Sequence, residues 1–408
     1  MEKTYKEYIS SGISWIGDIP TDWNIRKGKT LYSIRTGKLD ANAENPEGEY
    51  PFFTCSMYPQ KIDNYAFDCE ALLVAGNGIV GFTQYYNGKF NAYQRTYVLS
   101  DFKDVYPIYL KYYVSNNLST EVAPNSVGSV IQFIKLSDLQ NFNIALPSYN
   151  QQVEIANFLE NRCSQIDSLI SLQEEMISEL QSYKISYITK IVTSGIKEYS
   201  KLKDSGVDWI GQIPETWTVT KFKNLFRIKK DIAGKLGLDV LSVTQKGLKI
   251  KDLSKNEGQL AQDYSKYQLV SVEDFVMNHM DLHTGFVDLS AFEGVTSPDY
   301  RTFRTINNNI TDNHYYLKIF QICYWTRLFY NLGQGVSTLG RWRLPAEQQN
   351  NFMLPVPPLE EQKEIAVHLD KKMAQIDSLI DIKEKKICEL KDYKKSIIFE
   401  YVTGKKRV

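Results

Sequence analysis

Two parts of the sequence bring together side chains that can hydrogen-bond to bases and phosphates. In the first part, amides, hydroxyls, aromatic rings and Arg95 crowd around the glycine turns Gly76-Asn77-Gly78 and Asn87-Gly88. In the second part, cations cluster near Tyr300 and Trp342. Arginine, lysine, asparagine and glutamine contact base edges, while cationic, hydroxyl and amide groups hold phosphates. These clusters indicate a nucleic-acid contact surface, although any one of the residues taken alone is equally well explained as a solvated surface side chain.

Motifs for catalysis do not accompany these groups. The sequence contains no Asn-Pro-Pro-Tyr or Asp-Pro-Pro-Tyr segment for adenine methylation, and no Gly-x-x-x-x-Gly-Lys-Ser/Thr loop for a nucleotide phosphate. His279 and His283 have the helical spacing of metal ligands, but no third ligand or general-base glutamate accompanies them. We expect the chain to be non-catalytic and to bind neither a metal nor a cofactor.

Composition limits the class of protein. The 408 residues are enough for two to three domains, and the 48 basic and 48 acidic residues give zero net charge. A strongly basic chain is therefore excluded, and positive charge for DNA would have to be arranged locally. No apolar run is long enough for a transmembrane helix or a signal peptide. Five cysteines without a Cys-x-x-Cys pair argue against disulfides and zinc, so a cytoplasmic protein is expected.

A long stretch that would position these surfaces occurs twice. The first copy reads Gln-Val-Glu-Ile-Ala-Asn-Phe-Leu from Gln152, and the second reads Gln-Lys-Glu-Ile-Ala-Val-His-Leu from Gln362. Both continue through an identical Gln-Ile-Asp-Ser-Leu-Ile segment. Apolar residues recur at alternating steps of three and four, the period of a coiled-coil helix. A helix over residues 151–191 would be roughly 60 Å long at about 1.5 Å per residue.

The shared register predicts that the two helices pair with each other as an antiparallel coiled coil. The alternative is that each apolar seam packs onto the globular parts of the chain. The residues expected to form the pairing seam are Leu159, Ile166, Ile170, Ile177 and Leu180 in the first helix, and Leu369, Ile376, Ile380, Ile387 and Leu390 in the second.

A second repeat precedes each long helix. Residues 11–23 and 205–217 share the pattern Trp-Ile-Gly-x-Ile-Pro, which combines an aromatic anchor, a glycine turn and a proline-restricted exit. We interpret each copy as a clasp at a domain edge that binds no ligand. Between clasp and helix lie two unlike domains with short strand-like runs and helical stretches at residues 107–116 and 314–330. Because the two domains begin and end with shared motifs but differ in between, they indicate one scaffold with two reading surfaces.

The predicted fold class is therefore α+β, with two mixed α/β domains separated by the coiled coil. The expected divisions are a first domain over residues 1–145, a helix and linker over 146–206, a second domain over 207–355, and a second helix over 356–408. Val192-Thr193-Ser194-Gly195 leads into the second clasp, and Val402-Thr403-Gly404-Lys405 stands at the matching place near the end of the chain. We expect the termini to lie close together in a circular, pseudo-twofold arrangement.

These features resemble the specificity subunit of type I restriction–modification systems, over essentially the whole chain. The resemblance rests on Trp15-Ile16-Gly17-x-Ile19-Pro20 and Trp209-Ile210-Gly211-x-Ile213-Pro214. It rests also on Leu146-Pro147-x-x-x-Gln151-Gln152-x-x-Ile155-Ala156-x-x-Leu159 and on Val356-Pro357-Pro358-Leu359-Glu360-Glu361-Gln362-x-x-Ile365-Ala366-x-x-Leu369.

The resemblance implies a DNA reader without catalytic activity of its own. Each domain would be a target-recognition domain that reads one half of a split, asymmetric target in double-stranded DNA. The helices would set the spacing between the halves and dock two adenine-methylating methyltransferase subunits. Restriction subunits are a further possible partner. S-adenosylmethionine, ATP and Mg²⁺ would belong to the partner subunits only, and no membrane would be involved.

With DNA as the partner, the polar clusters give the candidate contact residues. In the first domain they are Arg35, Lys38, Asn77, Tyr85, Tyr86, Lys89, Tyr93, Arg95, Ser129 and Gln132. In the second domain they are Lys229, Lys230, Lys246, Lys249, Tyr300, Arg301, Arg304, Ser337, Arg341 and Arg343.

Two other functions stay open at this point. One is a coiled-coil scaffold whose domains bind protein and do not read DNA. The other is an orphan specificity subunit that retargets the methyltransferase of another system. Sequence-selective, salt-dependent DNA binding would separate the scaffold from both DNA readers.

Overall fold

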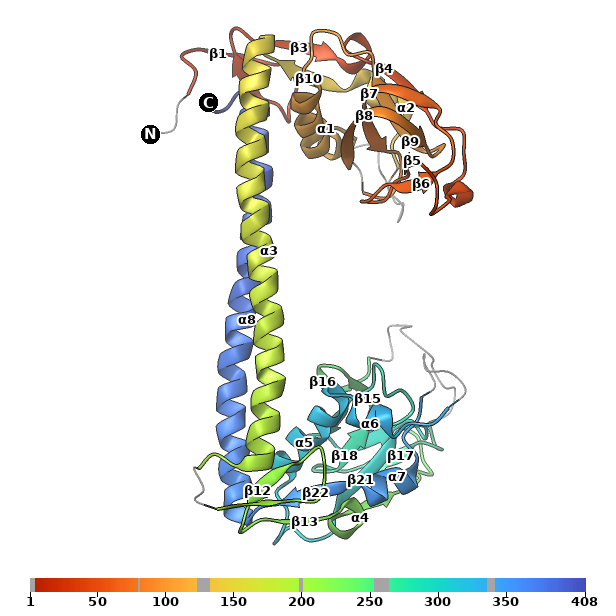
Figure 1. Ribbon diagram of the computed structural model, residues 1–408, viewed down its shortest axis with the longest axis vertical. Helices are drawn as coiled ribbons and strands as arrows, with labels where there is room; N and C mark the ends of the chain where they lie inside the picture. The colour runs from red at the N-terminus through yellow and green to blue at the C-terminus, as the bar shows by residue number, and fades with distance from the viewer. Residues whose placement is uncertain (1–3, 80, 123–132, 198–200, 253–263, 336–341) are drawn as a thin grey trace. The chain divides into compact units, whose positions relative to one another are not determined.

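The computed structural model describes residues 4–79, 81–122, 133–197, 201–252, 264–335 and 342–408. The chain forms two compact units, one made of residues 1–174 with 384–408 and the other of residues 175–383. Each unit combines a globular head with part of both long helices (Figure 1). The α+β class predicted from the sequence is confirmed.

The head of the first unit is built on a six-stranded sheet. Its order is β4 (Ser33–Thr36), β9 (Thr96–Ser100), β7 (Phe67–Ala75), β8 (Thr83–Ala92), β5 (Tyr50–Phe53) and β6 (Gln60–Ile62). Buried Leu72, Val98 and Leu99 reflect the β-branched and aliphatic content that favours central strands. Helix α1 (Pro107–Val122) contacts β7 and β8, and η1 (Gly28–Thr30), η2 (Ala41–Ala43) and α2 (Leu136–Asn141) complete the head.

The head of the second unit has two four-stranded sheets. One has the order β14 (Phe226–Lys229), β21 (Arg301–Thr305), β18 (Phe275–Met277) and β19 (Val287–Leu289). The other has the order β16 (Gly247–Ile250), β15 (Val240–Thr244), β20 (Gly294–Thr296) and β17 (Gln268–Val270). Helices α4 (Phe222–Leu225), α5 (Asn313–Trp325), α6 (Leu328–Asn331) and α7 (Ala346–Asn351) accompany them.

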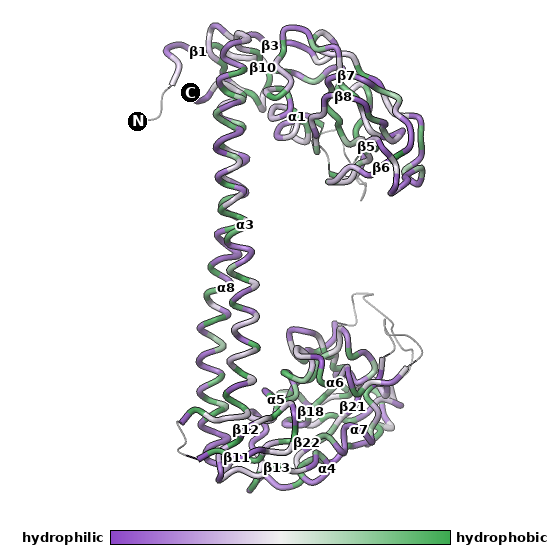
Figure 2. Tube along the Cα trace, viewed as in Figure 1, coloured by the Kyte–Doolittle hydropathy of each residue, from purple (hydrophilic) through white to green (hydrophobic). Residues whose placement is uncertain are grey.

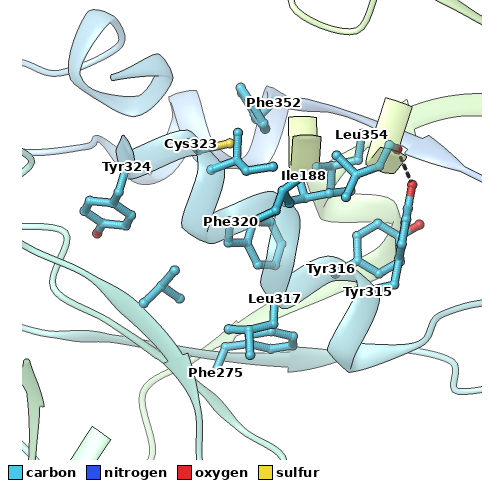
Figure 3. Close-up of a cluster of buried hydrophobic side chains, with 14 of the residues drawn as sticks. Ile188, Phe275, Tyr315, Tyr316, Leu317, Phe320, Cys323, Tyr324, Phe352 and Leu354 are labelled. Carbon is cyan, nitrogen blue, oxygen red and sulfur yellow. Dashed lines mark hydrogen bonds between the residues drawn. The ribbon is translucent and has the colours of Figure 1, made fainter. Parts of the chain in front are cut away.

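The core of the second head extends into both long helices. Tyr315, Tyr316 and Phe320 of α5 lie with Ile188 of the first long helix in one buried cluster (Figure 3). Leu369 of the second long helix belongs to the same cluster. Because these side chains share one core, the head cannot pack fully without the helices.

The two heads share one strand scaffold despite their different sequences. The antiparallel order β4-β9-β7-β8 in the first matches β14-β21-β18-β19 in the second. The parallel pairing of Phe52 with Asn91 matches that of Leu241 with Thr296. In the first head the single strand β8 makes both the antiparallel pairing with β7 and the parallel pairing with β5. In the second head two strands share these pairings, β19 with β18 and β20 with β15. The expectation of one scaffold with different interiors is thus refined to one sheet topology used twice.

One predicted helix is interrupted. The stretch expected over residues 314–330 is two helices, α5 and α6. Arg327 separates them with φ 61°, a left-handed conformation that a continuous α-helix does not allow. The stretch expected to be helical at residues 107–116 is confirmed within α1.

The two predicted long helices are α3 (Tyr149–Ser194) and α8 (Leu359–Val402), and they pair antiparallel within each unit. In the first unit the Phe158 and Tyr401 ring centroids are 4.4 Å apart. In the second unit Tyr187 Oη lies 2.7 Å from His368 Nε2. Hydrophobic and hydrophilic residues alternate along both helices (Figure 2). The predicted seam residues are all buried or half-buried.

Two ion pairs at equivalent places set the register of these helices. Lys184 Nζ lies 2.6 Å from Asp377 in the second unit, and Lys394 Nζ lies 2.6 Å from Asp167 in the first. Each pair joins the same lysine of one repeat to the same aspartate of the other. Their carboxylates are about half exposed, so each pair contributes only some tenths of a kcal/mol, and seam packing supplies most of the stability.

Each predicted clasp is a short hairpin next to a second strand pair. The hairpins are β1 (Tyr8–Ser10) with β2 (Asp18–Pro20), and β11 (Leu202–Asp204) with β12 (Gln212–Pro214). The strand pairs are β3 (Asn24–Lys27) with β10 (Asn143–Leu146), and β13 (Thr218–Lys221) with β22 (Met353–Val356). The ring of Trp15 stacks on Phe142, and that of Trp209 stacks on Phe352. The aromatic anchors therefore serve packing between clasp and head.

The two ends of the chain meet in the first unit, as predicted. Tyr8 Oη donates to the Lys405 carbonyl at 3.3 Å, and the Arg407 guanidinium lies over the Tyr5 ring. Gly404 adopts φ +73°, and a Cβ there would approach the Pro20 ring to 2.4 Å. Glycine is required at this contact because both its backbone angle and the available space exclude a side chain.

A buried glutamine fastens each head to its own long helix. Gln152 accepts from the Tyr106 amide at 2.7 Å and donates to the Asp104 and Pro147 carbonyls. Gln362 accepts from the Asp312 amide at 2.8 Å and donates to the carbonyls of residues 310 and 357. Both side chains are fully buried, so the repeated glutamine serves as a structural clamp.

One tyrosine in each head bonds to the end of the long helix that does not follow that head in the chain. Tyr109 Oη lies 2.9 Å from the Val402 carbonyl of α8 in the first unit. Tyr315 Oη donates to the Val192 carbonyl of α3 at 2.7 Å in the second. These carbonyls lie in the last turns of their helices, where no further helical amide satisfies them.

Replacing Gln362 by leucine is expected to destabilise the second unit by about 2–4 kcal/mol. The leucine would fill similar volume but leave the Asp312 amide and two carbonyls, of which that of residue 357 is buried, without their partner, and buried groups of this kind cost about 1–3 kcal/mol each. Urea unfolding followed by circular dichroism measures the change. Glu360→Leu, at an exposed position of the same helix turn, is the matched control. An equal loss in both variants would contradict the clamp.

Candidate nucleic-acid interface

Four turns of the first head converge at one end of its sheet. We call them the first reading edge, made of residues 54–58, 76–79, 93–96 and 133–134. The Gly76 amide donates to the Arg95 carbonyl at 2.9 Å, and the Ile134 amide donates to the Gly76 carbonyl at 3.0 Å. Gln84 Nε2 donates to the Met57 carbonyl at 2.6 Å and so holds the first turn. Backbone hydrogen bonds and the Gln84 side chain therefore hold these turns in place.

The first reading edge exposes one arginine among apolar side chains. Arg95 and Gln94 are exposed at the tip of the turn between β8 and β9. The exposed hydrophobic side chains are Met57 at 63%, Tyr58 at 77%, Ile79 at 71% and Phe133 at 57%. Large apolar groups gathered on fixed turns indicate a contact surface rather than a core.

The turn after β7 also has the spacing Gly-x-Gly-x-x-Gly, from Gly76 to Gly81. A dinucleotide-binding loop with this spacing leads from a strand into a helix, whose N-terminus holds the pyrophosphate. Here strand β8 follows and pairs antiparallel with β7. The glycines therefore belong to a β-hairpin. Gly76 is needed because a Cβ would come within 2.3 Å of the Arg95 carbonyl oxygen.

The equivalent turns of the second head form the second reading edge, made of residues 245–246, 278–286, 297–300, 334–335 and 342–344. The Leu344 amide donates to the His279 carbonyl at 2.9 Å, as Ile134 does to Gly76 in the first head. Gln334 and Arg343 exchange both backbone hydrogen bonds, at 2.8 and 3.0 Å. A cavity of about 730 Å³ beside this edge has Tyr300 in its wall.

The second reading edge carries exposed cations beside the carboxylates of Asp281 and Asp299. Lys246 and Arg343 are exposed there, and the exposed Lys230 lies beside it, near His279. Burial lowers the pKa of His279 to about 3, and Arg301, Arg343 and Lys230 add to this effect by charge repulsion. His279 is therefore neutral at physiological pH, and its neighbours supply the positive charge of this edge.

The prediction of Arg301 as a DNA contact is wrong. Its side chain is buried, with Nη1 2.6 Å from Gln349 Oε1 and Nη2 donating to the Leu344 carbonyl at 3.1 Å. Burial lowers the pKa of its guanidinium to about 10, which still leaves it charged at neutral pH. Arg301 instead holds the strand segment that carries the neighbouring Arg343.

Two further predicted cations are occupied within the second head. Lys229 is buried and pairs with Asp274, so its assignment to DNA is corrected. Arg304 Nε donates to the same carboxylate at 2.9 Å, although its side chain is 48% exposed. Asp274 thus joins β14 and β21 from inside the sheet.

Replacing Arg301 by alanine should lower stability by about 2–4 kcal/mol, because Gln349 and the Leu344 carbonyl would lose their buried donors. Differential scanning calorimetry provides the measurement. Arg227→Ala removes the same charge from an exposed position of β14 and should change little. A variant of unaltered stability that bound DNA more weakly would restore the original assignment.

Several predicted contact residues in the first head have intramolecular roles. Arg35 donates to Ser100 Oγ at 3.0 Å, and Tyr85 donates to Glu70 at 2.8 Å. Lys89 lies over the Tyr65 ring. The half-buried Tyr86 packs its ring against Phe53 and Phe90, and its contact with DNA stays a prediction.

The remaining predicted residues fall into three groups. Exposed residues are Lys38, Arg95, Lys230, Lys246, Lys249 and Arg343, and half-buried ones are Asn77, Tyr93 and Tyr300. Ser129, Gln132, Ser337 and Arg341 lie outside the described residues. The structure therefore brings Asn77, Tyr93 and Arg95 together on the first edge, and Lys246, Tyr300 and Arg343 on the second, with Lys230 beside it.

The apolar residues of the first edge were missed by sequence reasoning. Met57, Tyr58, Ile79 and Phe133 look like core residues in a sequence, because hydrophobic type alone does not report exposure. One signal was present, since Phe133 and Arg343 occupy the same place relative to the repeated Gln152 and Gln362. A position that carries phenylalanine in one copy of a scaffold and arginine in the other is expected at the surface.

Apolar side chains are also exposed on the long helices, again at equivalent places. The first unit exposes Leu169 and Leu172 of α3 at 47% each and Tyr393 of α8 at 56%. The second exposes Leu379 and Ile382 of α8 at 48% and 59% and Tyr183 of α3 at 47%. We call these sets the two helix patches. Their repetition indicates two equivalent interaction surfaces.

Among the described residues, no group of three or more His, Cys, Asp or Glu is placed to hold a metal ion. The described helices also include none that is long and apolar enough to cross a membrane.

Two like-folded heads, each with an exposed edge of turns and each built onto both helices, define a duplicated recognition protein. Residues 20–182 and 214–392 match the family model of the type I restriction modification DNA specificity domain, and the chain belongs to this family. It is thus a specificity subunit of the type I restriction–modification class, concerned with recognition of a DNA target.

Known relatives agree with this assignment. The chain is 28% identical over 399 residues to the type I restriction enzyme EcoDI specificity subunit of Escherichia coli, covering 89% of this chain and 84% of the relative. It is 27% identical over 300 residues to the type I restriction enzyme MjaVIII specificity subunit of Methanocaldococcus jannaschii, covering 69% and 66%. A solved chain of a type I restriction–modification system shares the fold, with a TM-score of 0.66, 13% identity and coverage of 94% and 98%.

Proposed function

We propose that each head reads one half of a bipartite, asymmetric DNA target through its reading edge. The observation that carries this proposal is that one scaffold presents two different exposed chemistries at equivalent turns. Symmetric targets accompany symmetric readers, so two unlike edges favour two unlike half-sites. The chain has zero net charge, so positive charge for DNA must come from local side chains such as Arg95 and Arg343, which are exposed on the two edges.

The paired helices set the distance between the half-sites and dock two methyltransferase subunits, one on each helix patch. The two patches have matching chemistry, which suits two copies of one partner. The chain itself is non-catalytic in this proposal and works in the cytoplasm. S-adenosylmethionine belongs to the methyltransferase, which methylates adenine, and ATP with Mg²⁺ belongs to restriction subunits where these join the complex.

The test is sequence-selective DNA binding by the complex of this chain with its methyltransferase subunit. Methylome sequencing of cells with and without the chain should reveal a split target that depends on it. Filter binding to duplexes with that target should be selective and should weaken steeply with salt, because phosphate contacts release counterions. A protein scaffold would show neither result, and methylation only with the methyltransferase of another system would identify an orphan subunit.

Arg95→Ala should weaken binding to the intact target by about 1–3 kcal/mol, as expected for loss of a base-contacting arginine. The arginine is exposed on a turn whose backbone is fixed, so the fold should tolerate the change. Filter binding against targets altered in either half-site gives the result. Lys29→Ala, an exposed cation away from the reading edge, is the control. Unchanged affinity in the Arg95 variant would remove this residue from the interface.

A further inference from the structure

One position has the same backbone surroundings in both heads but carries an aromatic side chain in the first head and a cationic one in the second. Phe133 in the first head and Arg343 in the second each stand one residue before a buried aliphatic side chain, Ile134 and Leu344 respectively. Each aliphatic residue is followed closely by a short helix, α2 or α7, that leads to the strand before a long helix. The two positions are therefore equivalent in the scaffold.

Hydrogen bonds hold Phe133 on the first reading edge. It pairs with Asn77 in an isolated antiparallel bridge. The next residue, Ile134, donates to the Gly76 carbonyl, and Tyr97 Oη donates to the Ile134 carbonyl at 3.2 Å. Gly76 in turn donates to the Arg95 carbonyl, so Phe133 is two backbone contacts away from the exposed arginine.

Hydrogen bonds hold Arg343 on the second reading edge in the same manner. It pairs with Gln334 through both backbone bonds. Leu344 donates to the His279 carbonyl, and its own carbonyl accepts from Arg301 Nη2. Among the residues that the structure describes, no carboxylate pairs with Arg343. Its guanidinium is thus an exposed donor on a rigid backbone.

The two side chains suit different features of the major groove. An apolar group contacts the C5-methyl of thymine, whereas arginine donates two hydrogen bonds to guanine O6 and N7. Phe133 shares its edge with the exposed apolar Ile79, and Arg343 and Lys230 both lie close enough to His279 to act on it by charge. Each neighbourhood strengthens the preference of its own side chain.

We propose that this equivalent position determines specificity in both heads, with Phe133 recognising a thymine methyl in one half-site and Arg343 recognising a guanine in the other. The inference rests on the proposed function and deepens it by assigning base chemistry to each half. The position differs between the heads because the scaffold fixes where the side chain stands and leaves its identity free.

The experiment measures binding of the complex with its methyltransferase subunit to modified targets, once the target is known. Each thymine of the first half-site is replaced singly by uracil, which removes only the methyl group. Each guanine of the second is replaced singly by 7-deazaguanine, which removes only the N7 acceptor. One thymine replacement should weaken binding by about three- to tenfold, and one guanine replacement by about tenfold.

The variants decide whether these losses pass through the two residues. In Phe133→Ala the thymine and uracil targets should bind equally, while the sensitivity to 7-deazaguanine should remain. In Arg343→Ala the guanine and 7-deazaguanine targets should bind equally, while the sensitivity to uracil should remain. Leu136→Ala and Arg227→Ala, exposed residues of matching type, should keep both sensitivities.

The outcomes separate this inference from the proposed function. Selective binding in which both variants keep the wild-type sensitivities would overturn the inference and leave the DNA reader standing. A uniform loss for all targets in Arg343→Ala would assign that side chain to a phosphate and overturn its half of the inference. An absence of selective binding in the wild-type complex would defeat the proposed function itself.

Discussion

Replacing Asp274 by alanine is expected to destabilise the second unit by about 3–5 kcal/mol, enough to abolish most of the stability of an ordinary domain. The Asp274 side chain is 1% exposed and accepts from Lys229 Nζ and Arg304 Nε. Its carboxylate also accepts from the Ser271 amide at 2.9 Å. Without it, the ammonium of Lys229, on a side chain only 8% exposed, would lack its buried counter-charge.

Urea unfolding of the single variant provides the measurement. Asp299→Ala removes the same group from an exposed turn and should change stability by less than about 0.5 kcal/mol. The double variant Asp274→Leu with Lys229→Met should recover part of the loss, because apolar residues often replace a buried ion pair without cost. A single variant that lost under about 1 kcal/mol would show that Asp231, 3.7 Å from Lys229 Nζ, compensates for the missing charge.

Replacing Ile376 by aspartate should separate the paired helices and cost more than about 4 kcal/mol. Ile376 is 3% exposed in the seam and belongs to the core cluster of the second unit. The change removes buried apolar surface and places a carboxylate in it, and both effects act in the same direction. Since the helices contribute to the head's own core, unfolding should extend into the head.

The matched control lies two residues further on. Ser378→Asp adds the same charge at an exposed position of α8 and should be tolerated. Circular dichroism measures helix loss, and size-exclusion chromatography with the methyltransferase subunit measures assembly. If Ile376→Asp assembled normally and kept its helices, the seam would not be what holds them together.

The sequence repeats made the two long helices predictable. Which of the candidate contact residues are buried inside a head could not be predicted. A period of 3.5 over ten turns has few interpretations, so α3, α8 and the seam could be derived from residue spacing alone. The burial of Arg301 and Lys229 could not be predicted, because the sequence does not distinguish a cation that is paired inside a head from one that is exposed to bind DNA. Their partners Gln349 and Asp274 lie 45 or more residues away in the chain.

The interiors of the heads show a second limit. Short strands such as β18 and β20 carry three residues each, too few for a reliable periodicity, and their pairing depends on distant partners. The equal spacing of Phe133 and Arg343 from the repeated glutamines was the one signal in the sequence that placed Phe133 on the surface. The equivalence of Phe133 with Arg343 became informative only once the bridges to Asn77 and Gln334 showed both on matching edges.

The hydrogen bond from Tyr109 to the Val402 carbonyl can form only late in the synthesis of the chain. The first unit includes residues 384–408, which the ribosome makes only after the whole of the second unit. During synthesis, Tyr109 and the clasp of the first head therefore lack their contacts with the end of α8 until some two hundred further residues have been made. Contacts this distant in the chain slow folding, so slow translation or stalling within the second unit should expose the first head to proteases and chaperones.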